Sequence, residues 1–242
     1  MDWAGDGIVL TTRPHGESAA IIEVLTADLG LHRGVVRGGS GRRLTPVLQP
    51  GNTLALTWRA RLDDHLGHFT AEMLRSRAGA ILPHADRLAA LNALTALAAF
   101  ALPDRDPQPR LHALTEALLD LLADGAAPWF GAYLAWERAL LEETGYGLDL
   151  SDCAVTGATR GLAYVSPRTG RAVTAQAAGH WADRLLPLPP LLLDPRTADD
   201  RAQMAQGLAT TGHFLRHTLA PALGHRPLPE ARSRLEARFT PR

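Results

Sequence analysis

The chain has 242 residues, of which 46% are hydrophobic and 21% are charged, as in a globular protein with a buried core. Its 25 basic residues are all arginines, and 25 acidic residues bring the formal net charge to zero. The one cysteine, Cys153, excludes an intramolecular disulfide and a zinc site closed by cysteines. Because the start lacks a signal-peptide pattern and no apolar run reaches about 20 residues, we expect a cytoplasmic protein with no membrane partner.

The charges are unevenly distributed along the chain. Residues 31–62 hold six arginines and no acidic residue, whereas residues 81–150 hold four arginines and ten acidic residues. Residues 201–242 are basic again, with seven arginines and two acidic residues. Such asymmetry indicates the kind of partner rather than the fold, and it favours a polyanion.

Residues 6–77 show the alternation of apolar and polar side chains that is typical of strands. Glycine and proline at Gly30 and at residues 50–51 mark turns between the segments. Five short strands in about 75 residues predict a small closed barrel of the OB type. The expected strands are Gly7–Arg13, Ala20–Thr26, Leu31–Arg37, Leu54–Leu62 and His68–Arg77.

Helical spacing of apolar residues replaces this alternation after Arg77. We expect an α+β protein, with an OB-fold DNA-binding domain at residues 1–77 and a mostly helical domain at residues 81–242. The expected helices cover residues 86–102, 111–122, 129–144, 198–219 and 230–239, and a small hairpin joins Leu162–Val165 to Arg171–Thr174.

The arginines of the first basic region are the main candidate site. Guanidinium groups bind phosphates through paired donors, so we predict binding to a nucleic-acid backbone with little dependence on base sequence. Alternation places Arg59 and Arg61 on the face opposite to Trp58, and the glycines of residues 38–41 predict a mobile loop. The candidates are Arg33, Arg37, Arg42, Arg43, Arg59 and Arg61.

Two other readings of this region stay open. One is a solvated sheet face with scattered surface charge. The other is an OB-like adaptor that binds proteins and contacts DNA only incidentally, which the shortage of stacking aromatic residues on the sheet favours.

The helix at residues 129–144 carries a large aromatic face, formed by Trp129, Tyr133, Trp136 and Leu140. This face fits either core packing or a groove for an apolar peptide of a partner.

His213 and His217 are four residues apart on one expected helix face. That spacing can hold a metal, but no carboxylate completes a metal-binding motif. The sequence shows no catalytic constellation, so we expect a protein that is not an enzyme and that uses no cofactor or metal.

Several stretches resemble the bacterial RecO family of DNA repair and recombination mediators. The opening, GIVLTTRPHGESAAIIEVLTADLGLHRGVVRGG, is similar to the first three barrel strands of the family, and LQPGNTLALTWRARL is similar to the next. WERALLEETGYGLDLSDC is similar to the signature F-E-x-x-L-L-x-x-x-G-Y-x-x-x-x-x-x-C. HRPLPEARSRL resembles the closing segment G-x-x-x-L-x-S-R-x-x-L. The resemblance covers almost the whole chain in the expected order.

The resemblance implies an OB fold and a helical part that bind single- and double-stranded DNA and anneal complementary strands. It implies action with RecR, and in some organisms RecF, to help RecA displace single-strand binding protein, whose C-terminal tail the helical part can bind. Such a protein would be associated with the nucleoid. We expect Arg232 and Arg234 to extend the DNA contacts, and Trp136, Arg138 and Leu140 to bind a partner.

The sequence departs from the family at a zinc module. Many relatives carry four cysteines there, and Cys153 stands at the position of the first one. The later positions, near Gly157 and in residues 166–173, have no cysteine. We therefore expect a metal-free remnant at about residues 150–175, with its hairpin held by packing alone.

Overall fold

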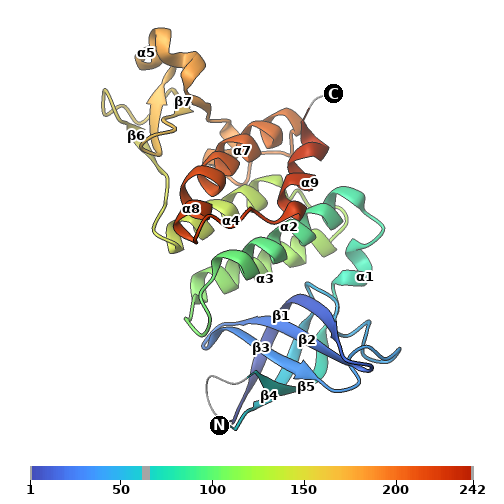
Figure 1. The fold of residues 1–242 in the computed structure, drawn as a ribbon. Helices are drawn as coiled ribbons and strands as arrows, with labels where there is room; N and C mark the ends of the chain where they lie inside the picture. Colours follow the sequence, from blue (N-terminus) through green and yellow to red (C-terminus); the bar gives the residue numbers. More distant parts are fainter. Residues whose placement is uncertain (1, 62–65, 241–242) are drawn as a thin grey trace. The chain divides into compact units, whose positions relative to one another are not determined.

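The structure is a computed structural model that describes residues 2–61 and 66–240, and Figure 1 shows it as a ribbon. The chain forms two compact units, Met1–Ala127 and Pro128–Arg242. The first holds a β-barrel and three helices, and the second holds packed helices and a small sheet. The predicted α+β class is confirmed. The predicted separation of domains between residues 77 and 81 stays a prediction.

The barrel closes in the strand order β1-β2-β3-β5-β4, which is the predicted OB arrangement. Its long first strand pairs with β4 from Asp2 to Ile8 and with β2 from Ile8 to His15, with an irregularity in the β2 pairing between Val9 and Thr11. The bend at this irregularity lets one strand close the barrel. The strands are β1 (Asp2–His15), β2 (Ala19–Thr26), β3 (Gly30–Val36), β4 (Thr53–Arg59) and β5 (Gly67–Arg75). The expected end of the fourth strand, Leu62, lies outside the described residues.

Two glycines make room for aromatic rings inside the barrel. Gly34 on β3 and Gly67 on β5 are register partners in the parallel pair of these strands. A Cβ atom at Gly67 would lie 2.2 Å from the Trp58 ring, and one at Gly34 would lie 2.6 Å from the Phe69 ring. Both rings are buried, so the prediction that Trp58 faces inward is confirmed.

The helices of the first unit are α1 (Ala78–Ile81), α2 (Ala85–Ala101) and α3 (Pro109–Ala123). Helix α2 contacts β1 and α3, and α3 contacts β2. The last carbonyl groups of a helix lack partners within it. Buried Arg87 on α2 donates hydrogen bonds to the carbonyl groups at the end of α3 and in the segment after it. The acceptors are the carbonyl oxygens of Leu121, Leu122, Asp124, Gly125 and Ala127.

The second unit is built on α4 (Phe130–Glu143), α7 (Arg201–Phe214) and α9 (Glu230–Phe239). The long helix expected at residues 198–219 is divided, because α7 passes into a π-helical turn (Leu215–Leu219) and then into α8 (Ala220–Ala222). The ring of Pro221 would clash with the carbonyl group four residues earlier in a regular helix, and the wider turn relieves this clash.

A small sheet lies in the same unit, with the strand order β6-β8-β7-β9. The expected hairpin is present as β7 (Leu162–Val165) and β8 (Arg171–Thr174), and β6 (Asp149–Cys153) and β9 (Leu186–Pro187) flank it. Two short elements follow β8, α5 (Ala175–Ala178) and the 3-10 turn η1 (Gly179–Arg184), and α6 (Pro190–Leu193) follows β9.

Candidate nucleic-acid interface

The outer face of β3, β5 and β4 carries basic side chains. Arg59 on β4 pairs with His68 on β5, which in turn pairs with Val35 on β3. Because successive side chains point to opposite faces, Arg59 and His68 lie outside while Trp58 lies inside. Two strand spacings, about 10 Å, separate the backbones of β4 and β3 here.

Arg33 lies on this face but is held in ion pairs. Its Nε donates to Glu23 Oε1 at 2.6 Å and its Nη1 donates to Asp104 Oδ2 at 2.7 Å. The segment that contains Asp104 also pairs with β3, since the N–H of Arg105 donates to the Leu31 carbonyl. Two carboxylates therefore already compensate the charge of Arg33, which makes it the weakest of the six barrel candidates.

The other five barrel arginines are exposed and form no ion pair with any residue that the structure describes. They fall into two groups by position. Arg37 starts the β3–β4 loop and Arg42 and Arg43 lie within it, whereas Arg59 and Arg61 lie at the end of β4 and just after it. We call these five residues the barrel arginines.

The β3–β4 loop is anchored rather than free, which corrects the expectation of a mobile glycine loop. Its backbone makes helical hydrogen bonds, from Thr45 N–H to the Gly41 carbonyl and from Leu48 N–H to the Leu44 carbonyl. The Ser40 hydroxyl donates to the Ala19 carbonyl at 2.7 Å. Leu48 is fully buried in the barrel core. Arg42 and Arg43 therefore project from a defined backbone.

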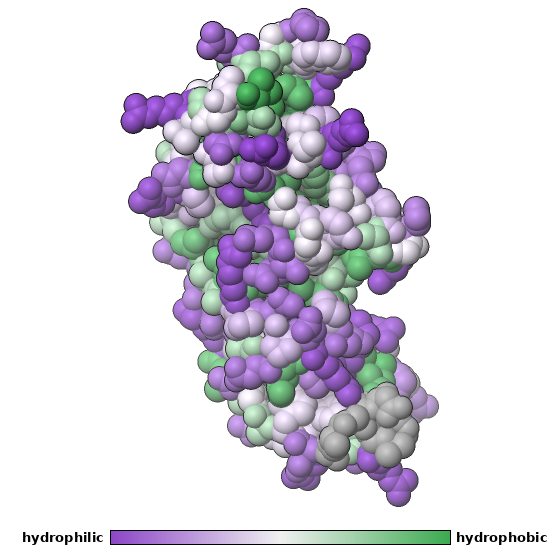
Figure 2. Space-filling view, turned by 90° about the vertical axis from the view of Figure 1, so that its left-hand side faces the viewer, coloured by the Kyte–Doolittle hydropathy of each residue, from purple (hydrophilic) through white to green (hydrophobic). Residues whose placement is uncertain are grey.

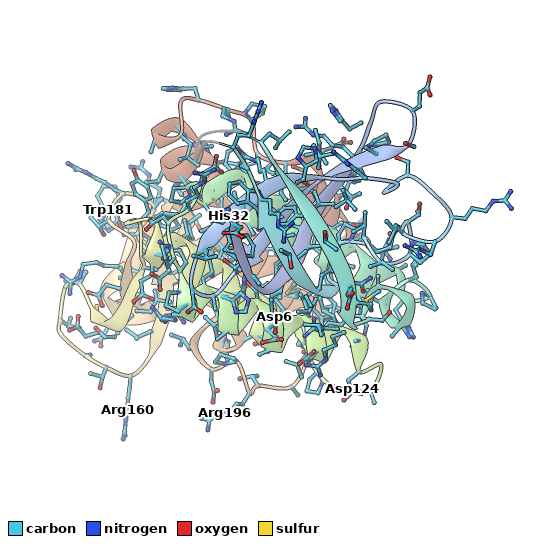
Figure 3. All side chains as sticks on the ribbon, turned by 90° about the horizontal axis from the view of Figure 1, so that it is seen from below. Asp6, His32, Asp124, Arg160, Trp181 and Arg196 are labelled. Atoms are coloured by element: carbon cyan, nitrogen blue, oxygen red, sulfur yellow. The ribbon has the colours of Figure 1, made fainter. Side chains whose placement is uncertain are left out.

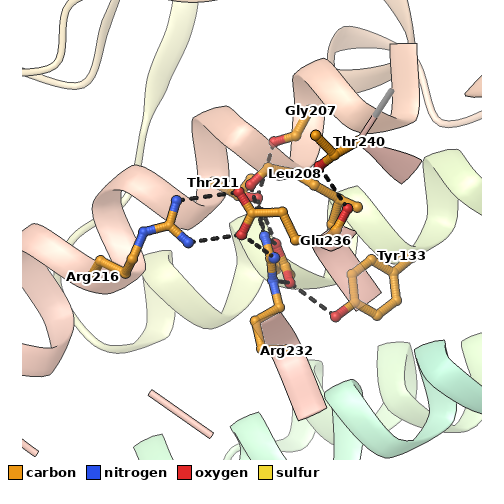
Figure 4. Close-up of polar contacts among 9 residues, drawn as sticks. Tyr133, Gly207, Leu208, Thr211, Arg216, Arg232, Glu236 and Thr240 are labelled. Atoms are coloured by element: carbon orange, nitrogen blue, oxygen red, sulfur yellow. Dashed lines mark hydrogen bonds and ion pairs between the residues drawn. The ribbon is translucent and has the colours of Figure 1, made fainter. Parts of the chain in front are cut away.

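Arg232 is not available to DNA in this structure, which corrects its prediction as a contact. It is fully buried in the second unit, where Figure 4 shows its guanidinium within a polar network. Its Nε and Nη2 donate to the two carboxylate oxygens of Glu137, and Nη2 also donates to the Leu208 carbonyl at 2.8 Å. Burial disfavours the charged guanidinium, but the paired Glu137 outweighs this and holds the pKa of Arg232 above its usual range.

Two other C-terminal arginines are partly compensated by acidic neighbours. Arg234 is 63% exposed and lies 3.2 Å from Glu230 one helical turn earlier. Arg216 pairs with Glu236 at 2.7 Å. The basic C-terminal stretch thus offers less free charge than its sequence indicates.

The aromatic face of α4 forms part of the core of the second unit. Trp136 and Leu140 are 1% and 0% exposed, so neither is a surface for a partner, and their prediction as partner contacts is corrected. The sequence left two interpretations of this face open, core packing or a groove for an apolar peptide of a partner, and the structure shows core packing. The third candidate, Arg138, donates from Nη1 to the Leu192 carbonyl at 2.8 Å.

Cys153 does not fit a zinc site. It is buried, and its sulfur accepts the N–H of Thr174 at 3.4 Å. A hydrogen bond with the Thr156 side chain, together with backbone N–H donors, lowers the pKa of Cys153 to about 6. No group of three or more His, Cys, Asp or Glu side chains in the described chain is placed to hold a metal. A lone thiolate cannot supply the four ligands of a structural zinc.

The histidine pair of the second unit lies in the segment that ends α7. The rings of His213 and His217 are 4.7 Å apart, and His213 Nε2 lies 3.3 Å from the Pro167 carbonyl oxygen. Burial lowers the pKa of His213.

Sequence reasoning missed two residues that the structure makes prominent. Arg77 is 1% exposed and joins the barrel to α3, which no local pattern reveals. Trp181 is half exposed, beside His180 and Arg184. The sequence HWADR, an aromatic residue between basic ones, was a signal that could have identified it.

A closed OB barrel that exposes arginines with no ion pair to any described residue defines a class of OB-fold proteins suited to binding nucleic acid. The sequence matches the family model "Recombination protein O N terminal" over residues 1–77 and "Recombination protein O C terminal" over residues 83–227. The chain therefore belongs to the RecO family. This confirms the resemblance and the expectation that the protein is not an enzyme.

Full-length relatives support this membership. The chain is 60% identical over 234 residues to the DNA repair protein RecO of Ruegeria sp. (strain TM1040), which covers 97% of this chain and 96% of the relative. It is 55% identical over 242 residues to the DNA repair protein RecO of Roseobacter denitrificans, with all of both chains covered. Among the helices in the described ranges, none has the length and apolar character needed to cross a membrane.

Proposed function

We propose that this protein is a DNA repair and recombination mediator that binds single- and double-stranded DNA and anneals complementary strands at the nucleoid. With RecR, and with RecF where it is present, it would help RecA to load onto DNA coated by single-strand binding protein, whose C-terminal tail it would bind. Membership of the RecO family over the whole chain supports this role. The observation that carries the DNA-binding part is the set of five exposed barrel arginines, which form no ion pair within residues 2–61 and 66–240.

The two groups of barrel arginines suit annealing. Two DNA strands repel each other, and guanidinium groups that bind phosphates of both strands lower this repulsion. Arg42 and Arg43 project from an anchored loop, and Arg59 lies on a strand, so the backbone that carries these three side chains is already ordered before DNA binds. Preorganisation of this kind reduces the entropic cost of association.

A second candidate function is a protein–protein adaptor with little DNA binding of its own. The observation in its favour is that Trp58 and Phe69 are buried, which leaves neither ring free to stack on a base. Titration with single-stranded DNA at several salt concentrations separates the two functions. The adaptor would show almost no binding even at low salt.

Reversal of charge at Arg42, Arg43, Arg59 and Arg61 to Glu tests the proposal. Each lost phosphate contact lowers the salt slope by about 0.7 for a single strand, so we expect the four changes to lower it by about 3. Annealing of complementary oligonucleotides should fall in parallel, to a rate close to that without protein. The measurements are fluorescence anisotropy across salt and an annealing time course.

The matched control replaces the same four arginines by lysines, which keeps every charge. This variant should retain most of the binding, with some loss because lysine does not form paired hydrogen bonds. If the glutamate variant folds as judged by circular dichroism and still anneals with the parent's salt dependence, the barrel arginines are not the DNA contacts.

A further inference from the structure

The small sheet of the second unit exposes a large aromatic ring. Trp181 lies in η1 and is 50% exposed, whereas Trp58, Trp129 and Trp136 are at most 4% exposed. A single exposed apolar residue needs no explanation by itself. The chemistry around this ring is what sets it apart.

Basic groups surround the ring. The Arg184 guanidinium lies 4.9 Å from the centroid of the Trp181 ring, and the His180 ring lies 4.9 Å from it on the same turn. Residues 149–185 contain four arginines and three acidic residues, and two of the acidic residues, Asp149 and Asp152, pair with Arg171. Arg160, Arg168 and Arg184 are exposed and have no ion-pair partner in the described chain. The small sheet therefore presents an aromatic ring within an excess of free positive charge.

The figures show how these groups are presented. Figure 3 labels Trp181 and Arg160 at opposite ends of the yellow part of the ribbon, which is the small sheet and its turns, so Arg184 is the arginine that accompanies the ring. Figure 2 shows apolar residues flanked by hydrophilic ones at the top, where this part of the chain lies. Because Trp181 is 50% exposed, its ring is open to a ligand that also meets Arg184.

We propose that the small sheet binds single-stranded DNA by stacking an unpaired base on Trp181 while Arg184, beside the ring, binds a phosphate of the same strand. This inference rests on the proposed function. Proteins that hold single strands combine aromatic stacking with a basic surface, and arginine adds a cation–π contribution. The bases of a duplex are already stacked on each other, so this site selects single strands. The excess of arginine favours a polyanion over a neutral or basic peptide.

The site would complement the barrel. The barrel arginines contact phosphates, which single and double strands share, so they discriminate weakly between the two. Because Trp58 and Phe69 are buried, these rings of the barrel cannot supply a stacking surface. Trp181 would give the protein a preference for unpaired bases through its other unit.

The experiment compares two oligonucleotides of equal length, one of thymidines and one of abasic sugar-phosphates, with the full-length protein. We expect the parent to bind the thymidine strand about 5- to 100-fold more tightly than the abasic strand. Trp181→Ala should bring this ratio close to one, and Trp181→Phe should retain most of it. Binding to duplex should be the same for all three proteins. The exposure of Trp181 makes loss of folding an improbable cause, and thermal melting checks it.

Fluorescence gives a second readout. Binding of the thymidine strand should quench the tryptophan emission of the parent, and Trp181→Phe should lose this quenching while it keeps its affinity. If Trp181→Ala keeps the parent's ratio between the two strands, the inference is overturned, the proposed function stands, and an acidic protein segment becomes the better ligand for this surface. If the parent binds neither strand nor duplex, the proposed function itself falls, and the inference falls with it.

Discussion

Arg232 and Glu137 form a fully buried ion pair, and its surroundings explain how it is tolerated. A charge removed from water costs several kcal/mol unless partners compensate it. Here Glu137 accepts hydrogen bonds from Arg232, from the Tyr133 hydroxyl at 2.9 Å and from the Thr211 hydroxyl. Burial raises the pKa of Tyr133 well above its ordinary value, and the nearby Glu137 raises it further, so this hydroxyl remains a donor. The pair joins α9 to α4, and Thr211 joins it to α7.

Loss of one member of this pair should be costly. Arg232→Met should lower the free energy of unfolding by about 3–5 kcal/mol, because it leaves the Glu137 carboxylate buried without its cation. The double variant Arg232→Met/Glu137→Leu should recover most of this loss, since no unpaired charge remains. Arg234→Met, on the exposed side of the same helix, is the control and should change stability by less than about 0.5 kcal/mol. Denaturation in urea measures all three, and equal stability of Arg232→Met and the control would show that the pair contributes little.

The β3–β4 loop shows how one buried side chain orders an element. Asn52 is 1% exposed, and its Oδ1 accepts the N–H groups of Arg77 and Ala78 at 2.9 and 3.1 Å. Its Nδ2 donates to the carbonyls of Pro46 and Val47 at 3.0 and 3.2 Å. Asn52 thereby connects the end of the loop to the junction between β5 and α1. The loop that carries Arg42 and Arg43 depends on this connection.

Asn52→Leu tests this dependence. It keeps the branched shape but leaves two buried N–H groups without acceptors, so we expect a loss of about 2–4 kcal/mol in the free energy of unfolding. Hydrogen exchange should accelerate at the amides of Thr45 and Leu48, and single-stranded DNA should bind more weakly. Gln49→Ala removes one exposed hydrogen bond of the same loop and serves as the control. Unchanged exchange in Asn52→Leu would mean that the loop is ordered without this side chain.

How much the sequence could predict depended on how far apart along the chain the interacting residues lie. Local periodicity predicted strands of the barrel such as β4, whose side chains alternate between core and surface at Trp58 and Arg59, and the turn residues 166–170 predicted the β7–β8 hairpin. The strands β6 and β9 are too short or irregular for such a pattern. The barrel arginines were identified because residues 31–62 hold six arginines and no acidic residue, and alternation placed Arg59 on the face opposite to Trp58. Arg232 was misplaced because its partner Glu137 is 95 residues away, and only the folded chain brings the two together.

At the scale of the whole molecule, the helices α1–α3 belong to the same compact unit as the barrel. Buried Arg77 donates to Asp120 Oδ1 on α3 at 2.6 Å and to Thr53 Oγ1 on β4 at 2.7 Å. A Cβ atom at Gly51, which adjoins β4, would lie 2.7 Å from the Leu91 side chain of α2. The barrel therefore uses α2 and α3 to cover part of its surface.

This arrangement predicts which fragment folds. A fragment of residues 1–127 should unfold in one cooperative thermal transition, because it keeps both partners of each contact that joins the barrel to α2 and α3. A fragment of residues 1–80 leaves Arg77 without Asp120 and exposes apolar surface beneath the missing helices. We expect it to melt at least about 10 °C lower, since about 1 kcal/mol corresponds to 4–8 °C in a domain of this size. Asp120→Asn in the longer fragment removes only the charge that pairs with Arg77. It should therefore lower the melting temperature by only a fraction of this amount. If the two fragments melt together, the barrel alone is the folding unit and the boundary lies near residue 77.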